Sequence, residues 1–462
     1  MAKVSGPLFS VDARGTLGGS ISFKKNGDCI RVEKKPVPQN KRSALQAVQR
    51  VKFKGCSTSW RQVWPFQRDF CKAEGDRLGM TGFDWWMREC LIGRAVVLKP
   101  VDDYAYVATV DATAHVDYGL AYPVTYVFSV TSPVSGMIAW HKHRESDEWE
   151  EVSIKARGAF DSGEEVVRVD LASGKAYFSL SFDAGSDKVY MGLTESNGSG
   201  VEITFERVAR YYDDKQAVVV CTSDDWTGDW EASHIAACEM FRPKKVWITE
   251  GLDTIAWGGH PLLNWANVQY QLDSGFVEAA SHSRTHPWCP YSDYDGEIGG
   301  SAQDIRNNLV LPWPYRVGSL QYVPCWLEPY GDSNATVRAH LGQYKYLCDR
   351  RYPETPGTSF DVWDAANGVY GRSTMRVEPS DAGEHNVATL NGYFDACYAL
   401  GQIYHLMIHP FLISDWDEPG YMAQHLNHLK DKDDVWYVGF GALYMYHYCE
   451  ERGKVTVAKM AA

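Results

Sequence analysis

The sequence lacks several features that mark familiar classes of protein. No run approaches the roughly 18 apolar residues of a membrane-spanning helix, and no internal repeat or low-complexity segment occurs. The N-terminus, MAKVSGPLFS, has no apolar stretch of the kind found in a secretory signal peptide. The 11 cysteines are odd in number and form no CxxC pair, which argues against a disulfide-stapled secreted domain. We therefore expect synthesis and folding in a reducing cytoplasm, without a signal peptide.

Positive charge is also scarce. The chain has 46 Lys and Arg against 59 Asp and Glu, a net charge of -13, which argues against a nucleic-acid partner. The N-terminal segment is locally basic but has no long run of basic residues, and a solvated face is the expected explanation. Aromatic residues are plentiful, with 17 Trp and 27 Tyr. Such side chains can stack on sugars, but they more often build cores and interfaces.

Changes of pattern along the 462 residues predict three domains, 1–95, 96–215 and 216–462. The first should be a small α+β domain. Alternating segments around Ile21 and Ile30 flank Asn26-Gly27, a hairpin signal, and three helical patterns follow. These patterns cover 44–60, which Ser43 can cap, then 67–78, and then a stretch from Thr81 to Leu91.

The second and third domains differ in periodicity. Residues 96–215 alternate apolar and polar side chains between regularly spaced turns, which is typical of an antiparallel β-sandwich. This domain could be a spacer or a carbohydrate-binding module. From Ala217 onward, short apolar strands alternate with helical segments, for example strand 217–221, helix 231–241 and strand 245–249. That alternation favours an α/β region with parallel strands.

Two polar clusters follow apolar strands in the third domain. The first lies at the end of the segment Val218–Trp226, where Asp224 and Asp225 are adjacent and can point in different directions. The second is His282-Ser283-Arg284-Thr285-His286, followed by Pro287. Two His and one carboxylate suit a borderline divalent metal such as zinc and leave positions open for water and substrate. Taken separately, an acidic loop and structural histidines remain alternatives.

Two weaker clusters lie further along the chain. Pro329-Tyr330-Gly331 is a turn that can aim a backbone N–H into a cleft, although on its own an ordinary surface turn is the favoured interpretation. An apolar strand ends at His409, which beside a metal site would be a candidate general acid and elsewhere a structural histidine.

Taken in order, these clusters resemble the motifs of the polysaccharide deacetylases, the NodB-like carbohydrate esterases. Thr222–Trp226 corresponds to Thr-Phe-Asp-Asp-Gly, His282–His286 matches His-Ser/Thr-x-x-His completely, and Leu327–Gly331 corresponds to Arg-x-Pro-Tyr-Gly. Leu406–His409 corresponds to the apolar strand that ends in His, and the similarity extends to 435–441. The resemblance implies a distorted (β/α) barrel and a hydrolase that removes acetyl groups from a glycan.

The resemblance also implies roles for five site residues. Asp225, His282 and His286 would hold a divalent metal ion, zinc first, with Co2+, Mn2+ or Ni2+ as alternatives. Asp224 would be the general base that takes a proton from the attacking water. His409 would be the general acid that protonates the leaving amine or sugar oxygen.

Three further residues follow from the resemblance, and one departs from it. The backbone N–H of Tyr330 would stabilise the oxyanion, and Met407 would line the pocket for the acetyl methyl group. Trp363, in a candidate fourth motif at 360–364, would form an aromatic wall. Leu327 stands where the family has an Arg that orients the catalytic Asp with help from an acid in the fourth motif. This departure puts the tuning of the catalytic base in doubt.

The N-terminal segment has a resemblance of its own. Gly6–Gly15, Gln46, Arg50, Trp60 and Thr81–Phe83 resemble a small domain of tailed-phage and prophage structural proteins. That resemblance implies a virion-attached, tail-associated enzyme that leaves the cell at host lysis and contacts other virion proteins through residues 1–95. A generic attachment domain is the alternative.

These observations leave several functions open. The leading hypothesis is a virion deacetylase that acts on capsule, exopolysaccharide or peptidoglycan, with a homo-oligomer expected because virion appendages are often symmetric. The alternative is a catalytically impaired glycan-binding or structural virion protein that retains the deacetylase fold. Intracellular deacetylation of a small molecule is a further hypothesis.

Overall fold

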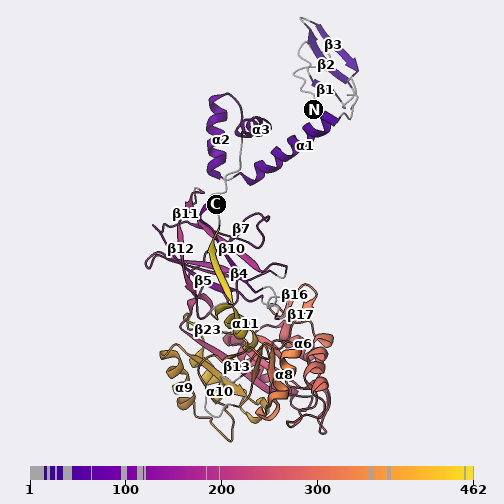
Figure 1. Ribbon diagram of the computed structural model, residues 1–462, viewed down its shortest axis with the longest axis vertical. Coiled ribbons are helices and arrows are strands. Elements are labelled where there is room, and N and C mark those ends of the chain that lie inside the picture. The colour runs from indigo at the N-terminus through magenta and orange to yellow at the C-terminus, as the bar shows by residue number, and fades with distance from the viewer. Residues whose placement is uncertain are drawn as a thin grey trace. The chain divides into compact units, whose positions relative to one another are not determined.

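The chain forms two compact units, Met1–Leu98 and Lys99–Ala462, in a computed structural model (Figure 1). The structure describes residues 15–17, 21–26, 29–34, 44–63, 65–94, 101–111, 118, 121–183, 185–196, 198–352, 357–371, 376–451 and 454–460. Most of the phage-like Gly6–Gly15 stretch, together with Gly27 and Ser43, lies outside the described residues. No described helix is both long and apolar enough to span a membrane.

In its described residues, the first unit contains a small antiparallel sheet and three α-helices. The sheet comprises β1 (Gly15–Leu17), β2 (Ile21–Asn26) and β3 (Cys29–Lys34), and the helical elements are α1 (Ala44–Ser59), η1 (Trp60–Gln62), α2 (Pro65–Arg77) and α3 (Gly82–Leu91). Asn26 pairs with Cys29, which confirms the predicted hairpin. The helix bounds lie within a few residues of the predicted ones, and Thr81 caps α3 by accepting the Asp84 N–H at 3.1 Å.

A disulfide joins two of these helices. Cys56 on α1 and Cys90 on α3 are bonded, and Trp86 packs beside them with its Nε1 donating to the Cys56 carbonyl at 3.1 Å. The cysteine pattern of the sequence argued against a disulfide-stapled domain and did not indicate this single pair. The two residues are 34 positions apart without a recognisable spacing, so only the packing of α1 against α3 brings them together.

The second unit begins with two antiparallel sheets. One has the order β24-β4-β10-β6-β7, with β11 on β10, and the other has the order β12-β5-β9-β8. Their bounds are β4 (Tyr106–Val110), β5 (Val124–Val130), β6 (Ile138–Lys142), β7 (Glu150–Val152), β8 (Val166–Asp170), β9 (Lys175–Leu180), β10 (Lys188–Thr194), β11 (Gly200–Val201), β12 (Ile203–Val208) and β24 (Val455–Lys459), with the short turns η2 (Asp102–Tyr104) and η3 (Tyr212–Asp214). The rings of Tyr106 on β4 and Phe128 on β5 lie 5.1 Å apart, so the two sheets share one core.

The rest of this unit is built around a largely parallel sheet. In the described residues nine strands follow the order β20-β21-β19-β18-β15-β14-β13-β22, with β23 on β13, and only the β20–β21 pair is antiparallel. The strands are β13 (Ala217–Trp226), β14 (Ile248–Leu252), β15 (Val277–Ser281), β18 (Cys325–Leu327), β19 (Cys348–Arg350), β20 (Trp363–Asp364), β21 (Val369–Tyr370), β22 (Ile403–Ile408) and β23 (Val435–Tyr437). All ten residues of β13 are buried, as expected for a central parallel strand.

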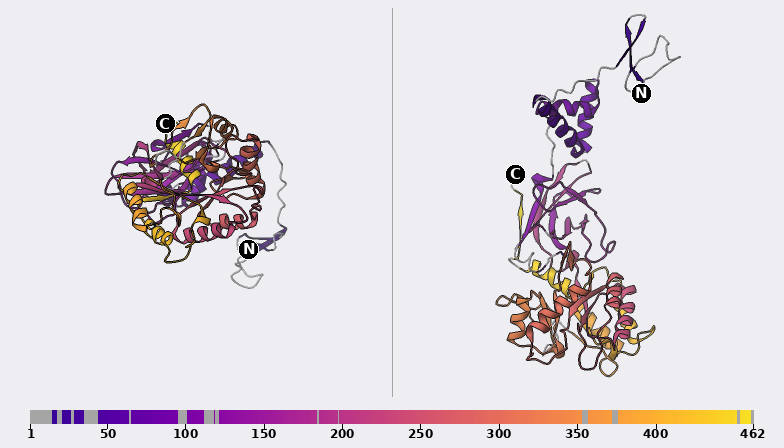
Figure 2. Two further views of the ribbon diagram at one scale, coloured as in Figure 1. Left: turned by 90° about the horizontal axis from the view of Figure 1, so that it is seen from below. Right: turned by 90° about the vertical axis from the view of Figure 1, so that its right-hand side faces the viewer.

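Helices lie on the outside of this sheet (Figure 2). They are α5 (Glu231–Phe241), η4 (Arg242–Lys244), α6 (Trp265–Asp273), η5 (Asp295–Gly300), α7 (Ser301–Asn308), η6 (Pro329–Gly331), α8 (Ala335–Gln343), α9 (Val387–Ala399), η7 (Pro410–Leu412), α10 (Tyr421–Leu429) and α11 (Phe440–Glu450), and a small hairpin joins β16 (Arg316–Val317) to β17 (Leu320–Gln321). The several sheets and helices make this a multidomain α/β protein. The three-domain boundaries and the closure of the parallel sheet into a barrel stay predictions.

Candidate functional site

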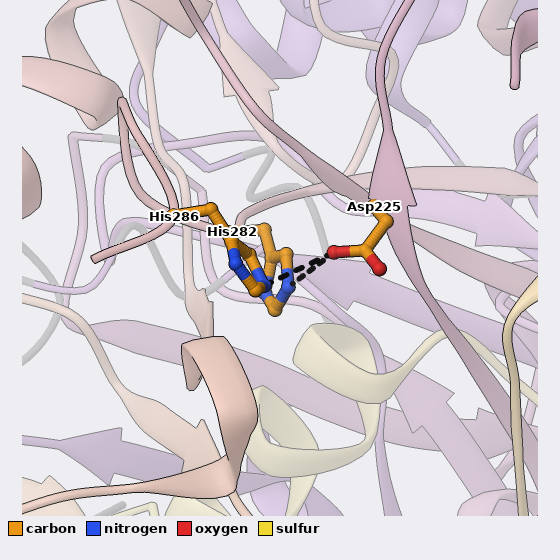
Figure 3. Close-up of side chains that lie close together, drawn as sticks. All are labelled: Asp225, His282 and His286. Carbon is orange, nitrogen blue, oxygen red and sulfur yellow. Dashed lines mark ion pairs between the residues drawn. The ribbon is translucent and has the colours of Figure 1, made fainter. Parts of the chain in front are cut away.

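Three side chains converge at the carboxyl ends of the parallel strands (Figure 3). Asp225 lies near the end of β13, and His282 and His286 follow β15. Asp225 Oδ1 is 3.2 Å from His282 Nε2 and 3.1 Å from His286 Nε2, and all three residues are buried. The three ligand atoms lie within 4.8 Å of one another, so these buried side chains could hold a metal ion. We call Asp225, His282 and His286 the metal group.

The hydrogen bonding of His282 fits a cation at this place. Its Nδ1 lies 2.8 Å from the Leu327 carbonyl, so Nδ1 carries a hydrogen and Nε2 faces the carboxylate of Asp225. Neither Asp225 Oδ1 nor His282 Nε2 has a hydrogen-bond partner among the described residues, although both are buried. Two facing acceptors require a positive charge between them, which a divalent ion or a proton can supply.

The acidic surroundings of His282 favour a protonated imidazole when no metal is bound. Burial lowers the pKa of His282, but the carboxylates of Asp224, Asp225 and Asp253 outweigh burial and raise the pKa to about 9. Binding of a metal ion would therefore displace a proton from this imidazole.

Asp224 adjoins the metal group and is paired with a buried arginine. Its carboxylate forms an ion pair with Arg350 at the end of β19, and Arg350 is completely buried. Burial raises the pKa of Asp224, but the charges of Arg350, His282 and His409 together outweigh burial and lower the pKa below its usual value. Asp224 is therefore an anion that can accept a proton.

Arg350 occupies the position next to the residue that departs from the family pattern. Leu327 on β18 pairs with Arg350 on β19, so the two side chains belong to neighbouring strands at the same level. The guanidinium thus comes from one strand further along the sheet. The sequence could not indicate this, because the Asp224–Arg350 pair joins positions 126 residues apart.

His409 follows β22 and also faces the metal group. Its Nε2 lies 3.6 Å from Asp225 Oδ2, and its Nδ1 lies 2.9 Å from Glu378 Oε1. Burial lowers the pKa of His409, but the hydrogen bond with Glu378 and the negative charges of Asp224, Asp225 and Glu378 together outweigh burial and raise the pKa. A protonated imidazole in this position can donate a proton.

Sequence reasoning missed Glu378. Val377 forms a parallel bridge with Leu406 of β22, and this bridge carries the next residue to the strand end where His409 lies. The available signal was a short segment, Arg376-Val377-Glu378-Pro379, in which an acid follows an apolar residue. The candidate fourth motif at 360–364 is elsewhere, because its Asp361 accepts a hydrogen bond from Tyr444 on α11 at 2.8 Å.

The remaining predicted residues differ in their placement. Tyr330 lies beside His286, with ring centroids 4.3 Å apart, and has a left-handed backbone with φ of 58°. Met407 is fully buried behind the cleft, and its sulfur is 3.8 Å from Tyr352 Oη.

Trp363 is not brought into the site. It packs against Tyr118 and Tyr448, with ring centroids 6.0 Å and 5.2 Å away. Its strand reaches the sheet through Tyr370, which pairs with the first residue of β19, whereas the site gathers at the strand ends. Trp363 therefore does not form the aromatic wall of the cleft that the sequence predicted.

The converging residues open into a cleft of about 340 Å³. It is lined by Asp224, Asp225, His282, His286, Trp288, Tyr330, Tyr352, His409, Phe411 and Leu412. A group that could hold a metal ion, an anionic carboxylate and a protonated imidazole in one cleft are chemically suited to metal-assisted hydrolysis of an acyl bond.

No protein-family model and no curated protein matches this chain. Several solved structures are similar to part of it. A protein assigned as a polysaccharide deacetylase from Mycobacterium smegmatis has 13% identity and a TM-score of 0.39, over 56% of this chain and 99% of that one. One so assigned from Pseudomonas aeruginosa PAO1 has 14% identity and a TM-score of 0.39, and a PuuE allantoinase has 11% and 0.41; each covers 52% of this chain and 93% of its own. These likenesses are too distant to assign an activity, which rests on the geometry of the site.

Proposed function

We propose that this chain is a metal-dependent deacetylase that hydrolyses acetyl groups on a polysaccharide. One observation carries the proposal. A buried Asp–His–His group adjoins a carboxylate held anionic by Arg350, and His409 reaches the same group with a hydrogen-bonded acid behind it. This combination joins a metal site to an acid and a base, and each has a partner that favours its charged form.

The proposed roles follow from the contacts of each residue. Asp225, His282 and His286 would hold a divalent ion, which when bound polarises a carbonyl and lowers the pKa of water. Asp224 would accept the proton of the water that attacks the acetyl carbon. The C–N or C–O bond then breaks, His409 would give its proton to the leaving amine or sugar oxygen, and acetate is released.

Two further roles concern the acyl group. The backbone N–H of Tyr330 would donate to the oxyanion that forms on the former carbonyl oxygen. This proposal is supported by the position of Tyr330 beside His286 at the edge of the cleft. Met407 would limit the acetyl pocket from behind Tyr352, with which its sulfur is in contact.

Acetate release from a panel of acetylated glycans tests the proposal. The panel comprises chitooligosaccharides, peptidoglycan and O-acetylated capsule. We expect release by the wild type, loss on chelation with recovery after Zn2+ is added, and a fall of at least roughly 10²-fold in Asp224→Asn. Metal analysis of Asp224→Asn should match the wild type, because Asp224 is outside the proposed ligand set. Release that persists after chelation would contradict the metal dependence.

The alternative, a glycan-binding or structural protein without turnover, depended on the missing arginine at Leu327. Because Arg350 forms an ion pair with Asp224, the Leu at position 327 gives no reason to prefer this alternative. Bound metal without acetate release from any member of the panel would revive it.

We also propose, from the sequence alone, that residues 1–95 attach the enzyme to a phage virion as a homo-oligomer. The chain should then be found by mass spectrometry in particles purified after host lysis. Its absence from such particles would contradict this part of the proposal.

A further inference from the structure

Two stacked aromatic pairs lie at the cleft, and the proposed chemistry uses none of their rings. In the first, the rings of Trp288 and Tyr330 are 3.4 Å apart and within 3° of parallel. Tyr330 in turn contacts the metal-group residue His286. Trp288 lies at the outer end of this stack and is 64% exposed. Such exposure is unusual for the largest apolar side chain, and it leaves one ring face open to the cleft.

The second aromatic pair begins beside His409, the proposed general acid. Phe411 stacks on Trp230, with ring centroids 4.0 Å apart and an angle of 15°, and it lies 5.6 Å from the ring of His409. The neighbouring Leu412 is 42% exposed. The cleft therefore has flat apolar surface next to both the metal group and the proposed acid.

Flat, rigid ring faces fit the C–H face of a pyranose ring, whose hydroxyl groups remain free to contact water. The charged residues of the cleft narrow the class of glycan that it would bind. Among the described residues that line it there are two carboxylates, Asp224 and Asp225, and no Lys or Arg. The whole chain is also acidic, with a net charge of -13. The described lining therefore offers no Lys or Arg side chain to pair with the acidic groups of a polyanionic glycan, whereas an uncharged glycan needs no such partner.

We propose that Trp288 is the platform for a second sugar ring, and that the substrate is an uncharged acetylated glycan of two or more residues. The inference rests on the proposed function of the same site. The acetylated ring lies at the metal group, and its neighbour along the glycan stacks on the exposed face of Trp288. Recognition of that neighbour distinguishes a polymer from an acetylated monosaccharide.

Steady-state acetate release from neutral N-acetylated chitooligosaccharides of one to six rings tests this. In the wild type, KM should fall once a second ring is present. Trp288→Ala should raise KM for the longer oligomers by roughly three- to tenfold, with kcat little changed, and Trp288→Phe should restore most of the loss. The monosaccharide should not distinguish the variants. A uronate-rich acetylated polymer should be a poorer substrate than the neutral oligomers.

Trp313→Ala is the matched control. Trp313 is also an exposed tryptophan stacked on a tyrosine, Tyr122, with ring centroids 5.9 Å apart, and it does not line the cleft. Equal KM values for Trp288→Ala and Trp313→Ala on long oligomers would overturn the platform, and equal use of the uronate-rich polymer would overturn the charge preference. If the wild type releases no acetate at all, the proposed function fails. Calorimetric titration of the hexamer into wild type and Trp288→Ala then tests the platform separately. A weaker affinity of Trp288→Ala would support the platform, and an equal affinity would overturn it.

Discussion

The charge of Asp224 is supported most strongly by the guanidinium of Arg350. Arg350 is fully buried and forms an ion pair with Asp224, so its removal would take away the largest counter-charge of a buried carboxylate. We expect Arg350→Leu to lower kcat by roughly 10²- to 10⁴-fold, because the base would be partly protonated and misoriented. Metal content should change little. Acetate release and metal analysis on the folded fraction measure both effects.

The neighbouring strand offers a sharp control for this prediction. Because Leu327 pairs with Arg350, the double exchange Leu327→Arg with Arg350→Leu returns an arginine to the same level of the sheet. We expect it to recover part of the lost kcat. Wild-type turnover in Arg350→Leu alone would show that Asp224 needs no guanidinium and would contradict the assignment.

Glu378 should act through His409 and not on the substrate. Its carboxylate holds Nδ1 of His409 at 2.9 Å, which fixes the ring with Nε2 toward the cleft. We expect Glu378→Gln to lower kcat by roughly 10- to 100-fold, with KM nearly unchanged. Glu206→Gln, which removes a carboxylate on β12 of the sandwich, is the control and should leave both constants unchanged. A rise in KM alone would assign Glu378 to substrate binding.

The contrast between these residues and the metal group shows how far sequence reasoning reached. Asp225, His282 and His286 lie within two short motifs at strand ends, so local order along the chain was enough to group them. Arg350 and Glu378 reach the site only through strand pairing, which the chain's local pattern does not encode. The aromatic residue in the candidate motif at 360–364 gave an incorrect prediction, since Trp363 packs against Tyr118 and Tyr448 and not in the cleft.

At the scale of elements, the start of α11 is packed against a buried carboxylate. Glu278 on β15 accepts hydrogen bonds from the Gly441 N–H at 2.9 Å and from Thr249 Oγ1 at 2.9 Å, and Cys325 Sγ lies 3.4 Å away. A side chain at Gly439 or Gly441 would collide with the Glu278 carboxylate. The two glycines therefore allow the helix to approach this group closely.

This contact should make stability depend on pH. Burial raises the pKa of Glu278 from 4.5 to about 7, although its hydrogen bonds oppose the rise. The folded chain therefore keeps this proton where the unfolded chain has lost it, and stability falls as pH rises from about 4.5 to about 7. The loss is of order 3 kcal/mol at most. Urea unfolding at several pH values should show a flatter profile in Glu278→Gln than in the wild type.

A control separates this group from general effects of charge. Glu206→Gln removes an exposed ion pair with Lys175 and should keep the wild-type pH profile. If Glu278→Gln and the wild type lose stability in parallel over this range, Glu278 does not hold a proton in the folded state.

The elements themselves were predicted unevenly. Helix α5 has the expected bounds, Glu231–Phe241, because its end coincides with the Pro-containing turn Arg242–Lys244. Strand β14 begins three residues later than expected, at Ile248. Lys245 adopts a left-handed backbone with φ of 54°, which turns the chain before the strand can pair, and this conformation has no clear signal in the sequence.

At the scale of the whole molecule, the last strand belongs with the first sheet of the second unit. β24 pairs antiparallel with β4, from Val455 opposite Val110 to Lys459 opposite Tyr106. Val455 and Val457 pack against the common core. The chain thus leaves the sandwich, forms the parallel sheet and returns, which no local pattern could indicate because the paired strands are separated by more than 300 residues.

This closure predicts that the second unit is independent. Lys99–Ala462 is compact on its own, and all of the proposed metal ligands, the base and the acid lie within it. We therefore expect a fragment of residues 99–462 to bind metal and release acetate with the kcat and KM of the full chain. Metal analysis and acetate release on the purified fragment measure this. Loss of either property would make residues 1–98 part of the catalytic machinery.

A shorter fragment, residues 99–450, separates folding from catalysis within that unit. It lacks β24 and so exposes the edge of β4, which removes a strand's hydrogen bonds and part of the apolar cover of the sandwich. We expect a lower unfolding temperature but unchanged acetate release per folded molecule, because the site is formed by a different sheet. Equal stability of the two fragments would mean that β24 contributes no net free energy to the sandwich, and loss of kcat in the folded fragment would couple the sandwich to the cleft.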